Sequence, residues 1–295
     1  MIQLSSAGEA ADAVTRAHDV SVLAYTLRRG PVVDALERAA AGGAHVRVRL
    51  EGEPFGDPNG ALARHNREIA EDLRRSGVDT LLSRLSRGDA PVHAKAIVAD
   101  ERLFLDDRNW GASDFVIADD DARAARYAAG AMVHDAACDG ADAPIALHKR
   151  SALERESILL HGAKPGDDVI VESESFGYAN PVCAALDTLA QNGVAVRLLV
   201  CTREARNDRE SKALARLAHD GVSVRLTEAT EKFAFTGTSA WIGSANASPD
   251  FGKPDMLDWG LITSDRAIVD AVRARVEARW AVAKRLSRPT NYGSR

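Results

Sequence analysis

The sequence predicts an α/β protein built from two similar subdomains. Patterns typical of strands alternate with amphipathic helical patterns along the 295 residues. Lys95 and Asn109 have counterparts in Lys232 and Asn246 at a single offset, 137 (232 − 95 and 246 − 109). A duplication of this length indicates two similar subdomains, because the repeats of a solenoid are much shorter.

The first elements of the chain set out the repeating unit. Residues 31–43 start with a proline, end with a glycine and predict a helix. Residues 46–50, VRVRL, predict the strand that follows. A second helical stretch then leads to a strand at 77–81.

The next two predicted strands carry the polar residues of the repeat. Residues 92–100, VHAKAIVAD, are rich in Ala, Val and Ile and end at a charged turn. Side chains alternate along a strand, so we expect His93 and Lys95 on one face. Residues 103–110 predict a second short strand whose end presents Asn109.

The second half repeats this order. The helix predicted at 181–193 and the strand at 196–200 lie 150 positions after their counterparts (181 − 31). The strand at 221–225 lies 144 positions later (221 − 77), so the first half carries longer loops. Residues 259–263 predict a further strand, and 266–280 form an amphipathic pattern that predicts a helix packed on a sheet.

These patterns give the predicted domain boundaries. Residues 1–145 form the first half and 146–286 the second, with the division after a helix and its Asp-rich turns at 118–143. The tail at 287–295 is rich in Pro, Asn, Gly and Ser, and we expect it to be disordered.

Composition narrows the class of protein. The hydrophobic content is 45% and the charged content 27%, as in a globular chain. A net charge of −5 argues against nonspecific nucleic-acid binding, although a basic cleft stays compatible with it. Three cysteines without metal-ligand spacing, no signal-peptide pattern and no long apolar stretch favour a cytoplasmic location without a transmembrane segment.

His93 and Lys95 suggest chemistry on an anion. A lysine can hold a phosphate oxygen while a neighbouring imidazole attacks or transfers a proton. At the offset of 137, the position of His93 holds Thr230 in the second half. By the same alternation Glu231 points away from Thr230 and Lys232, so it cannot replace the missing imidazole.

These residues resemble the phospholipase D superfamily, whose signature is His-x-Lys-x4-Asp followed by Gly-Ser-x-Asn. The first half keeps His93, Lys95 and Asp100, but Asp106 and Asp107 replace the Gly-Ser pair ahead of its asparagine. The second half keeps Gly243, Ser244 and Asn246, but has Thr230 for His and Gly237 for Asp. Each half is degenerate where the other is intact.

The resemblance implies two halves with mixed sheets flanked by helices, related by a pseudo-twofold axis, with both motifs at one cleft. It implies a phosphohistidine on His93 and a phosphate held by Lys95, Lys232, Asn109, Ser244 and Asn246. Asp258, before the strand at 259–263, would orient His93, while Asp114 would be the partner of the absent histidine. Asp100 and Gly243 would be structural.

Two classes of function follow from this pattern, and the sequence leaves both open. The first is a phosphodiesterase or phosphatidyltransferase with a single histidine, acting on a lipid, nucleotide or small metabolite. The second is a pseudoenzyme that binds a phosphorylated ligand or a partner; a nuclease is less favoured. For both classes we expect no cofactor and no metal. The site does not require an oligomer, because both half-sites are in one chain. Asp106 and Asp107 would repel a phosphodiester or recruit a cation if they faced the site.

Overall fold

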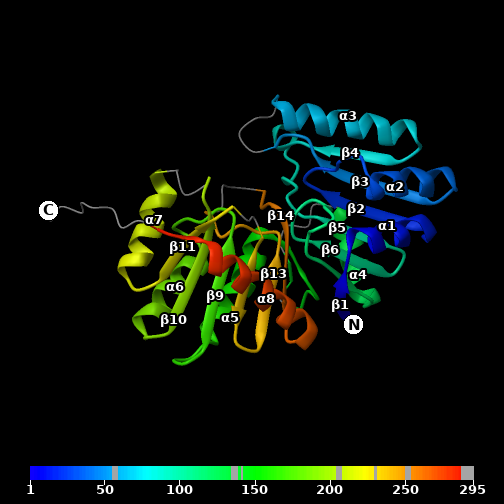
Figure 1. Ribbon diagram of the computed structural model, residues 1–295. Coiled ribbons are helices and arrows are strands. Elements are labelled where there is room, and N and C mark those ends of the chain that lie inside the picture. Colours follow the sequence, from blue (N-terminus) through cyan, green and yellow to red (C-terminus); the bar gives the residue numbers. More distant parts are fainter. Residues whose placement is uncertain are drawn as a thin grey trace. The chain divides into compact units, whose positions relative to one another are not determined.

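The computed structural model describes residues 1–54, 59–133, 139–140, 142–203, 208–228, 231–249 and 254–286 (Figure 1). Thr230 and the tail at 287–295 lie outside the described residues.

The chain divides into two compact units, each described here by itself. Unit 1 comprises Met1–Ala152 with Gly243–Ala245 and Phe251–Leu261. Unit 2 comprises Leu153–Ile242, Asn246–Asp250 and Ile262–Arg295. The two short C-terminal segments of unit 1 bring Ser244 and Asp258 into the same unit as His93.

The first sheet has seven strands in the order β1-β7-β6-β5-β2-β3-β4. β2, β3 and β4 are parallel, whereas β5, β6, β7 and β1 each pair antiparallel to their neighbour. Its strands are β1 (Ile2–Ser5), β2 (Asp19–Ala24), β3 (His45–Glu51), β4 (Asp79–Ser83), β5 (Ala96–Ala99), β6 (Arg102–Asp106) and β7 (Val116–Asp119).

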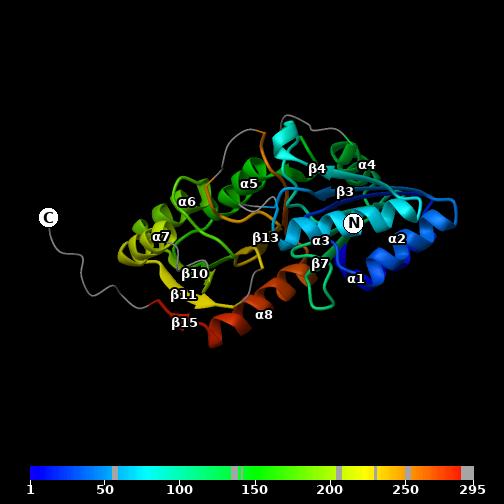
Figure 2. The same cartoon turned by 90° about the horizontal axis from the view of Figure 1, so that it is seen from above.

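Helices cover both faces of this sheet. They are α1 (Ala7–Arg16), α2 (Pro31–Ala41), α3 (Ala61–Arg75) and α4 (Ala122–Val133), with a 3-10 turn η1 (Leu85–Arg87). Figure 2 shows α1, α2 and α3 along one side of β3 and α4 on the other. The first group buries a core with the strands that includes Val22, Val48, Leu36 and Leu73, and burial of these apolar side chains drives the layers together.

The second sheet repeats the first. Its order is β15-β11-β10-β9-β12-β13-β14-β8, with β9, β10 and β11 parallel. The strands are β8 (Ala146–His148), β9 (Asp168–Ser173), β10 (Ala195–Cys201), β11 (Ser223–Thr227), β12 (Phe233–Thr236), β13 (Ser239–Gly243), β14 (Leu257–Thr263) and β15 (Lys284–Arg285). The helices are α5 (Lys149–His161), α6 (Pro181–Gln191), α7 (Asp208–His219) and α8 (Arg266–Val282).

The succession from β1 to α4 therefore recurs element by element from β8 to α8. Both β5/β12 and β6/β13 are offset by 137 (233 − 96 and 239 − 102), the offset of the lysine and asparagine motifs. The predicted α/β class and the internal duplication are confirmed.

One predicted strand is shorter than its pattern. β5 begins at Ala96, so His93 and Lys95 lie on the extended segment before it, and the prediction that they sit within a strand is wrong. The amides of His93 and Ala94 both donate to the carbonyl of Leu257, at 2.8 and 2.7 Å. Two successive amides on one acceptor cannot continue a ladder, in which successive amides point to opposite sides.

Candidate active site

His93 is held by a buried carboxylate. Its Nδ1 lies 2.8 Å from Oδ1 of Asp258, the second residue of β14. His93 is 8% exposed and Asp258 is 0% exposed. A hydrogen bond from Nδ1–H to the carboxylate selects the tautomer whose Nε2 carries the lone pair. The pair therefore prepares Nε2 for nucleophilic or basic chemistry.

Asp258 is stabilised as an anion. Burial alone would raise the pKa of this carboxyl, but His93, Lys95 and Lys149 supply favourable charge and hold the pKa below its ordinary value. Lys149, at the start of α5, is itself buried. Sequence patterns gave no signal for Lys149, because it belongs to neither motif.

Ser244 supports the carboxylate. Its hydroxyl donates to Oδ1 of Asp258 at 2.7 Å and accepts from the amide of Trp259 at 2.9 Å. That Ser244 binds phosphate stays a prediction; in this structure its single hydroxyl proton is directed to Asp258. Gly243 directly precedes it as the last residue of β13, so the Gly-Ser pair sets the carboxylate that orients the histidine.

Lys95 lies beside the imidazole. It is 1% exposed, and its Nζ donates to the carbonyl oxygen of His93. The same Nζ lies 5.4 Å from the ring centroid of Tyr25, and that ring makes an edge contact with His93 at 5.1 Å between centroids. The sequence motifs gave no signal for Tyr25, because it follows β2 and lies far from either motif in sequence.

Two buried polar residues fix the backbone around this cluster. Glu51, at the end of β3, accepts from the amide of Val92 at 2.6 Å, and burial raises its pKa. The side-chain amide of Asn66 donates to the carbonyls of Tyr25 and Glu51, each at 2.8 Å. Buried groups satisfied in this way leave the segment that carries His93 few alternative positions.

Asp100 ties the turn after β5 to the start of β2. Its carboxylate accepts from the amides of His18 and Asp19, at 3.0 and 2.9 Å. Its backbone has a φ of 53°, a conformation that an aspartate can adopt. Asp100 therefore stabilises the backbone at the turn after β5, as expected for a structural residue of the motif.

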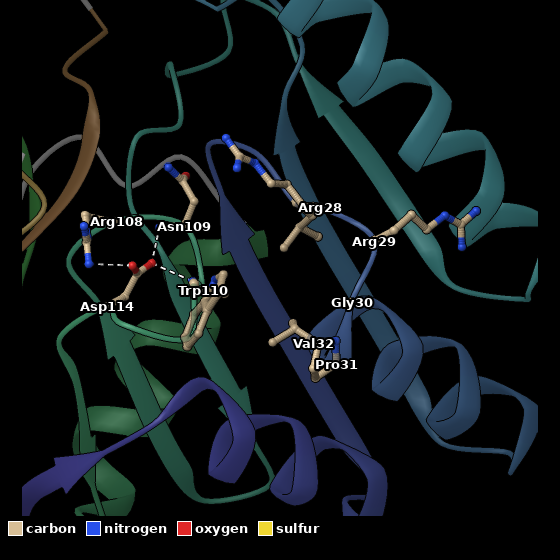
Figure 3. Close-up of a pocket in the computed structure, with 11 residues that line it drawn as sticks. Arg28, Arg29, Gly30, Pro31, Val32, Arg108, Asn109, Trp110 and Asp114 are labelled. Atoms are coloured by element: carbon tan, nitrogen blue, oxygen red, sulfur yellow. Dashed lines mark hydrogen bonds and ion pairs between the residues drawn. The ribbon is translucent and has the colours of Figure 1, made fainter.

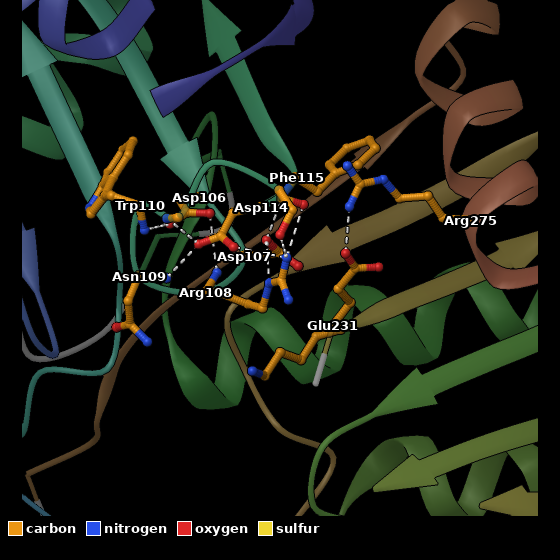
Figure 4. Close-up of polar contacts among 12 residues, drawn as sticks. Asp106, Asp107, Arg108, Asn109, Trp110, Asp114, Phe115, Glu231 and Arg275 are labelled. Atoms are coloured by element: carbon orange, nitrogen blue, oxygen red, sulfur yellow. Dashed lines mark hydrogen bonds and ion pairs between the residues drawn. The ribbon is translucent and has the colours of Figure 1, made fainter. Parts of the chain in front are cut away.

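The turn that follows β6 is built by three aspartates (Figure 4). Asp106 accepts from the amides of Arg108 and Trp110, and Asp107 accepts from the amide of Phe115 at 2.8 Å. Asp106 and Asp107 are both fully buried. They therefore neither face solvent nor present an open carboxylate to a ligand, and their task is to shape the turn.

Asp114 completes the same turn. It accepts from the amides of Asn109 and Gly111, at 3.0 and 2.6 Å, and forms an ion pair with Arg108 at 2.8 Å. Its counterpart at the offset of 144 (258 − 114) is Asp258, which holds His93. In the first half, the acidic residue at this position stabilises the turn and pairs with Arg108.

Burial raises the pKa of Asp106 well above its ordinary value, and the neighbouring carboxylates of Asp107 and Asp114 raise it further. The replacement of Gly-Ser by Asp-Asp thus places three carboxyls in one turn. Ionising all of them is opposed by their mutual repulsion.

Asn109 lies in this turn and lines a cavity of about 400 Å³ in unit 1 (Figure 3). Its Oδ1 is buried and has no hydrogen-bond partner among the described residues. The cavity lies between the turn and the segment that joins β2 to α2, and His93 and Lys95 are not among its lining residues. The structure thus gathers His93, Lys95, Asp258 and Ser244 in one cluster, with Asn109 on a cavity beside its own turn.

Two residues of the second motif, Lys232 and Asn246, lie in unit 2, where Lys232 directly precedes β12. Its Nζ forms an ion pair with Glu174 at 3.2 Å. Glu174 follows β9 as Tyr25 follows β2, at an offset of 149 (174 − 25). One lysine therefore contacts an aromatic ring and the other a carboxylate. Within the part of the chain that the structure describes, the buried Oδ1 of Asn246 has no hydrogen-bond partner, like that of Asn109.

Glu231 is committed to α8. It pairs with Arg275 at 2.5 Å (Figure 4) and with Arg279, which also contacts Glu172. In this buried network the side chain of Glu231 points to α8, whereas that of the next residue, Lys232, points to Glu174. The two side chains therefore lie on opposite sides of the chain, as predicted. Thr230, its neighbour, lies outside the described residues.

Outside the gaps in the structure, no cluster of three or more His, Cys, Asp or Glu side chains could hold a metal ion. No helix in the described part of the chain has the length and apolar character needed to cross a bilayer.

Comparison with known proteins gives a family match for part of the chain and a shared fold for nearly all of it. The model described as "Cardiolipin synthase, PLD-like domain" matches residues 159–280, which hold most of the second repeat. No curated protein matches the sequence. Among solved structures, the chain is similar to the phosphatidylserine synthase of Haemophilus influenzae, with a TM-score of 0.66 at 11% identity, over 97% of this chain and 87% of that one.

It is also similar to the polyphosphate kinase of Porphyromonas gingivalis, with a TM-score of 0.62 at 14% identity. That match covers 95% of this chain and 50% of the kinase, so the chain spans half the length of that protein. Identities this low show a shared fold. Residues 159–280 thus match a PLD-like domain, and the chain as a whole shares its duplicated α/β fold with the phosphatidylserine synthase.

Proposed function

We propose that the chain is a phosphodiesterase or phosphatidyltransferase that uses His93 as its nucleophile. One observation carries the proposal: the hydrogen-bond chain from Ser244 to Asp258 to Nδ1 of His93. A buried carboxylate that orients an imidazole is the arrangement by which hydrolases activate it. It stabilises the positive charge that the ring gains when Nε2 forms a bond.

In the first step Nε2 of His93 attacks the phosphorus of a diester. The bond from phosphorus to the leaving oxygen breaks, and the leaving group departs with the electron pair. The remaining substituent and the phosphoryl group stay on His93 as a substituted phosphohistidine. Water or an alcohol then attacks phosphorus and loses its proton to solvent, and the N–P electrons return to the ring.

The position across from His93 in the family pattern holds Thr230, whose hydroxyl is too weak an acid to protonate a leaving group near neutral pH. Loss of such acid help typically lowers a rate by about 10²–10⁴-fold. We therefore propose that the substrates have acidic leaving groups, such as phenols or phosphates, which depart without a proton.

Phosphate binding completes the proposal. Lys95 supplies positive charge beside the imidazole, and the family pattern assigns Lys232, Asn109 and Asn246 to the nonbridging oxygens. Ammonium groups and side-chain amides of this kind would stabilise the charge that develops on these oxygens in the transition state.

Hydrolysis of bis(p-nitrophenyl) phosphate tests the nucleophile. The H93A variant should lose all activity, because it removes the imidazole that Asp258 orients, whereas T230A should keep the wild-type rate. Equal losses in both variants, or a loss in neither, would contradict the proposal.

A second candidate function is binding of a phosphorylated ligand without turnover. It is favoured by the ion pair that offsets the charge of Lys232 with Glu174, and by the commitment of Asp114 to Arg108. A binding protein of this kind would retain an aryl phosphodiester on the chain without forming any covalent adduct at His93, and this outcome separates it from the enzyme.

A further inference from the structure

Lys149 is a buried basic residue of unit 1 that belongs to neither motif. It is the first residue of α5 and is 4% exposed. An ammonium group taken out of water is destabilising unless an opposite charge or hydrogen bonds compensate for the lost hydration. The position of Lys149 beside β14 identifies one such charge, the carboxylate of Asp258.

Backbone hydrogen bonds fix Lys149 against one edge of β14 and His93 against the other. The amide of Lys149 donates to the carbonyl of Met256 at 2.9 Å, and the preceding residue, His148, pairs with Leu257. On the opposite edge, the carbonyl of Leu257 accepts from the amide of His93 at 2.8 Å. The start of β14 therefore connects the start of α5 with the segment that carries the imidazole.

The alternation of side chains places Lys149 and Asp258 on the same face. The hydrogen bond from Lys149 to Met256 continues the ladder between β8 and β14 by one residue, and residues opposite each other in a ladder project to the same face. Met256 and Asp258 are two positions apart, so they share that face as well. His93 reaches the same face, since its Nδ1 lies 2.8 Å from Asp258.

The carboxylate of Asp258 thus interacts with three basic side chains. Burial opposes its ionised form, and the charges of His93, Lys95 and Lys149 favour it. Lys95 is 1% exposed, so both ammonium groups lie where water screens charge poorly. When the imidazole is neutral, two positive charges act on one negative charge in this cluster.

This balance matters because a nucleophilic imidazole must be neutral. A buried carboxylate next to an imidazole favours the imidazolium, which has no lone pair at Nε2. Asp258 alone would therefore hold His93 in its unreactive form. Positive charges near the ring have the opposite effect, and Lys149 adds one to that of Lys95.

Other titratable groups also lie around His93. The ring of Tyr25, which follows β2, contacts the imidazole edge-on at 5.1 Å between centroids. Glu51, at the end of β3, accepts from the amide of Val92, and burial raises the pKa of this carboxyl. A rise in the pKa of Glu51 reduces its negative charge near neutral pH, so Asp258 is the main anion beside the imidazole.

We infer that Lys149 is a positioning residue of the proposed reaction: its ammonium group shares the charge of Asp258 and so keeps the imidazole of His93 neutral and nucleophilic near neutral pH. Lys149 acts through Asp258 and does not contact the substrate. The catalytic consequence rests on the proposed function, whereas the effect on the protonation of His93 is measurable without turnover.

NMR titration of protein labelled with ¹⁵N-histidine tests the inference. The chain has 8 histidines, and the signals that disappear in H93A identify His93. In K149M, His93 should take up its proton at a higher pH than in the wild type, because a repelling charge has been removed. K149R keeps the charge and should titrate as the wild type does. If K149M does not fold, K149Q gives the same comparison.

The R150Q variant is the matched control, since it removes the positive charge of the next residue of the same helix, which is exposed. It should leave the titration of His93 unchanged, because water screens an exposed charge. An unchanged titration in K149M, an equal change in R150Q, or a wild-type His93 that stays protonated at pH 8 would overturn the inference.

The pH profile of kcat/KM for bis(p-nitrophenyl) phosphate links this effect to the reaction. The rate should fall at low pH as His93 is protonated, and this fall should begin at a higher pH in K149M than in the wild type. At high pH the two rates should converge, whereas loss of a residue that binds substrate would lower the rate at every pH and overturn the inference. The NMR change without turnover by the wild type would support the effect of Lys149 on His93 and contradict the proposed function.

Discussion

The hydroxyl group of Ser244 determines how the second motif supports the site in unit 1. Ser244 gives its proton to Asp258 and takes one from the amide of Trp259. In the first half the equivalent position (244 − 137) is Asp107, which accepts the equivalent amide, that of Phe115, at 2.8 Å. A serine can therefore set a neighbouring carboxylate against an imidazole, whereas an aspartate in its place repels that carboxylate.

Asp258 should matter more to turnover than to substrate binding. The D258N variant keeps the shape but loses the charge that stabilises the imidazolium, so kcat should fall by about 10²–10⁴-fold with a smaller change in KM. S244A should have a milder effect, because the carboxylate remains. Steady-state kinetics with an aryl phosphodiester measure both. A D258N variant with wild-type kcat would show that the pair is structural.

The ion pair between Glu174 and Lys232 gives a second test on single residues. If Lys232 holds a phosphate oxygen, the E174Q variant should lower KM by about two- to tenfold, because the ammonium no longer shares its charge with a carboxylate. In the K232A background the same glutamate substitution should have no effect on KM. A gain that persists without Lys232 would contradict a role for this ammonium.

Among the elements, the turn after β6 departs most from its counterpart after β13. It carries Asp106, Asp107 and Asp114, and Asp106 accepts two amides while its own carbonyl accepts from the indole of Trp259 at 2.9 Å. Buried carboxylates in such a turn make its stability depend on pH.

The D106N variant isolates this dependence. The pKa of Asp106 is raised on folding, so its protonated form contributes stability that is fully present below the pKa of the unfolded carboxyl, about 3.9, and is lost as pH rises through the folded pKa. Asparagine stays neutral, so the stability of D106N relative to the wild type should increase from pH 5 to pH 8 in urea unfolding.

The exposed Asp34 of α2 serves as the control, and D34N should give the same difference from the wild type at both pH values. If the stability difference for D106N were also the same at both, a proton bound on folding at this turn would be excluded.

At the scale of the whole molecule, the order of elements could be predicted because it follows from local patterns that occur twice. The helix at 266–280 and the strands at 46–50 and 196–200 are confirmed within a few residues. The start of β5 at Ala96 was not predictable from its own residues. The amides of His93 and Ala94, which precede the strand, bond to Leu257, more than 160 positions away.

The candidate site was predictable to a different degree. The motif spacing predicted His93 and Lys95, and the family resemblance predicted Asp258, which the structure places beside His93. Tyr25, Glu174 and Lys149 carried no such signal, since each is set beside a motif residue by tertiary structure alone. Aligning the ends of β2 and β9 would have paired Tyr25 with Glu174, but this offset of 149 is apparent only once the strand ends are known.

The central claim is that one chain carries one nucleophile, His93. Rapid quenching of the wild type with bis(p-nitrophenyl) phosphate, followed by mass spectrometry of peptides under alkaline conditions, tests it most directly. The account predicts a p-nitrophenyl phosphoryl adduct on His93, at one per chain or fewer, that is absent in H93A. Turnover by the wild type without any adduct on His93, or with an adduct on another residue, would contradict it.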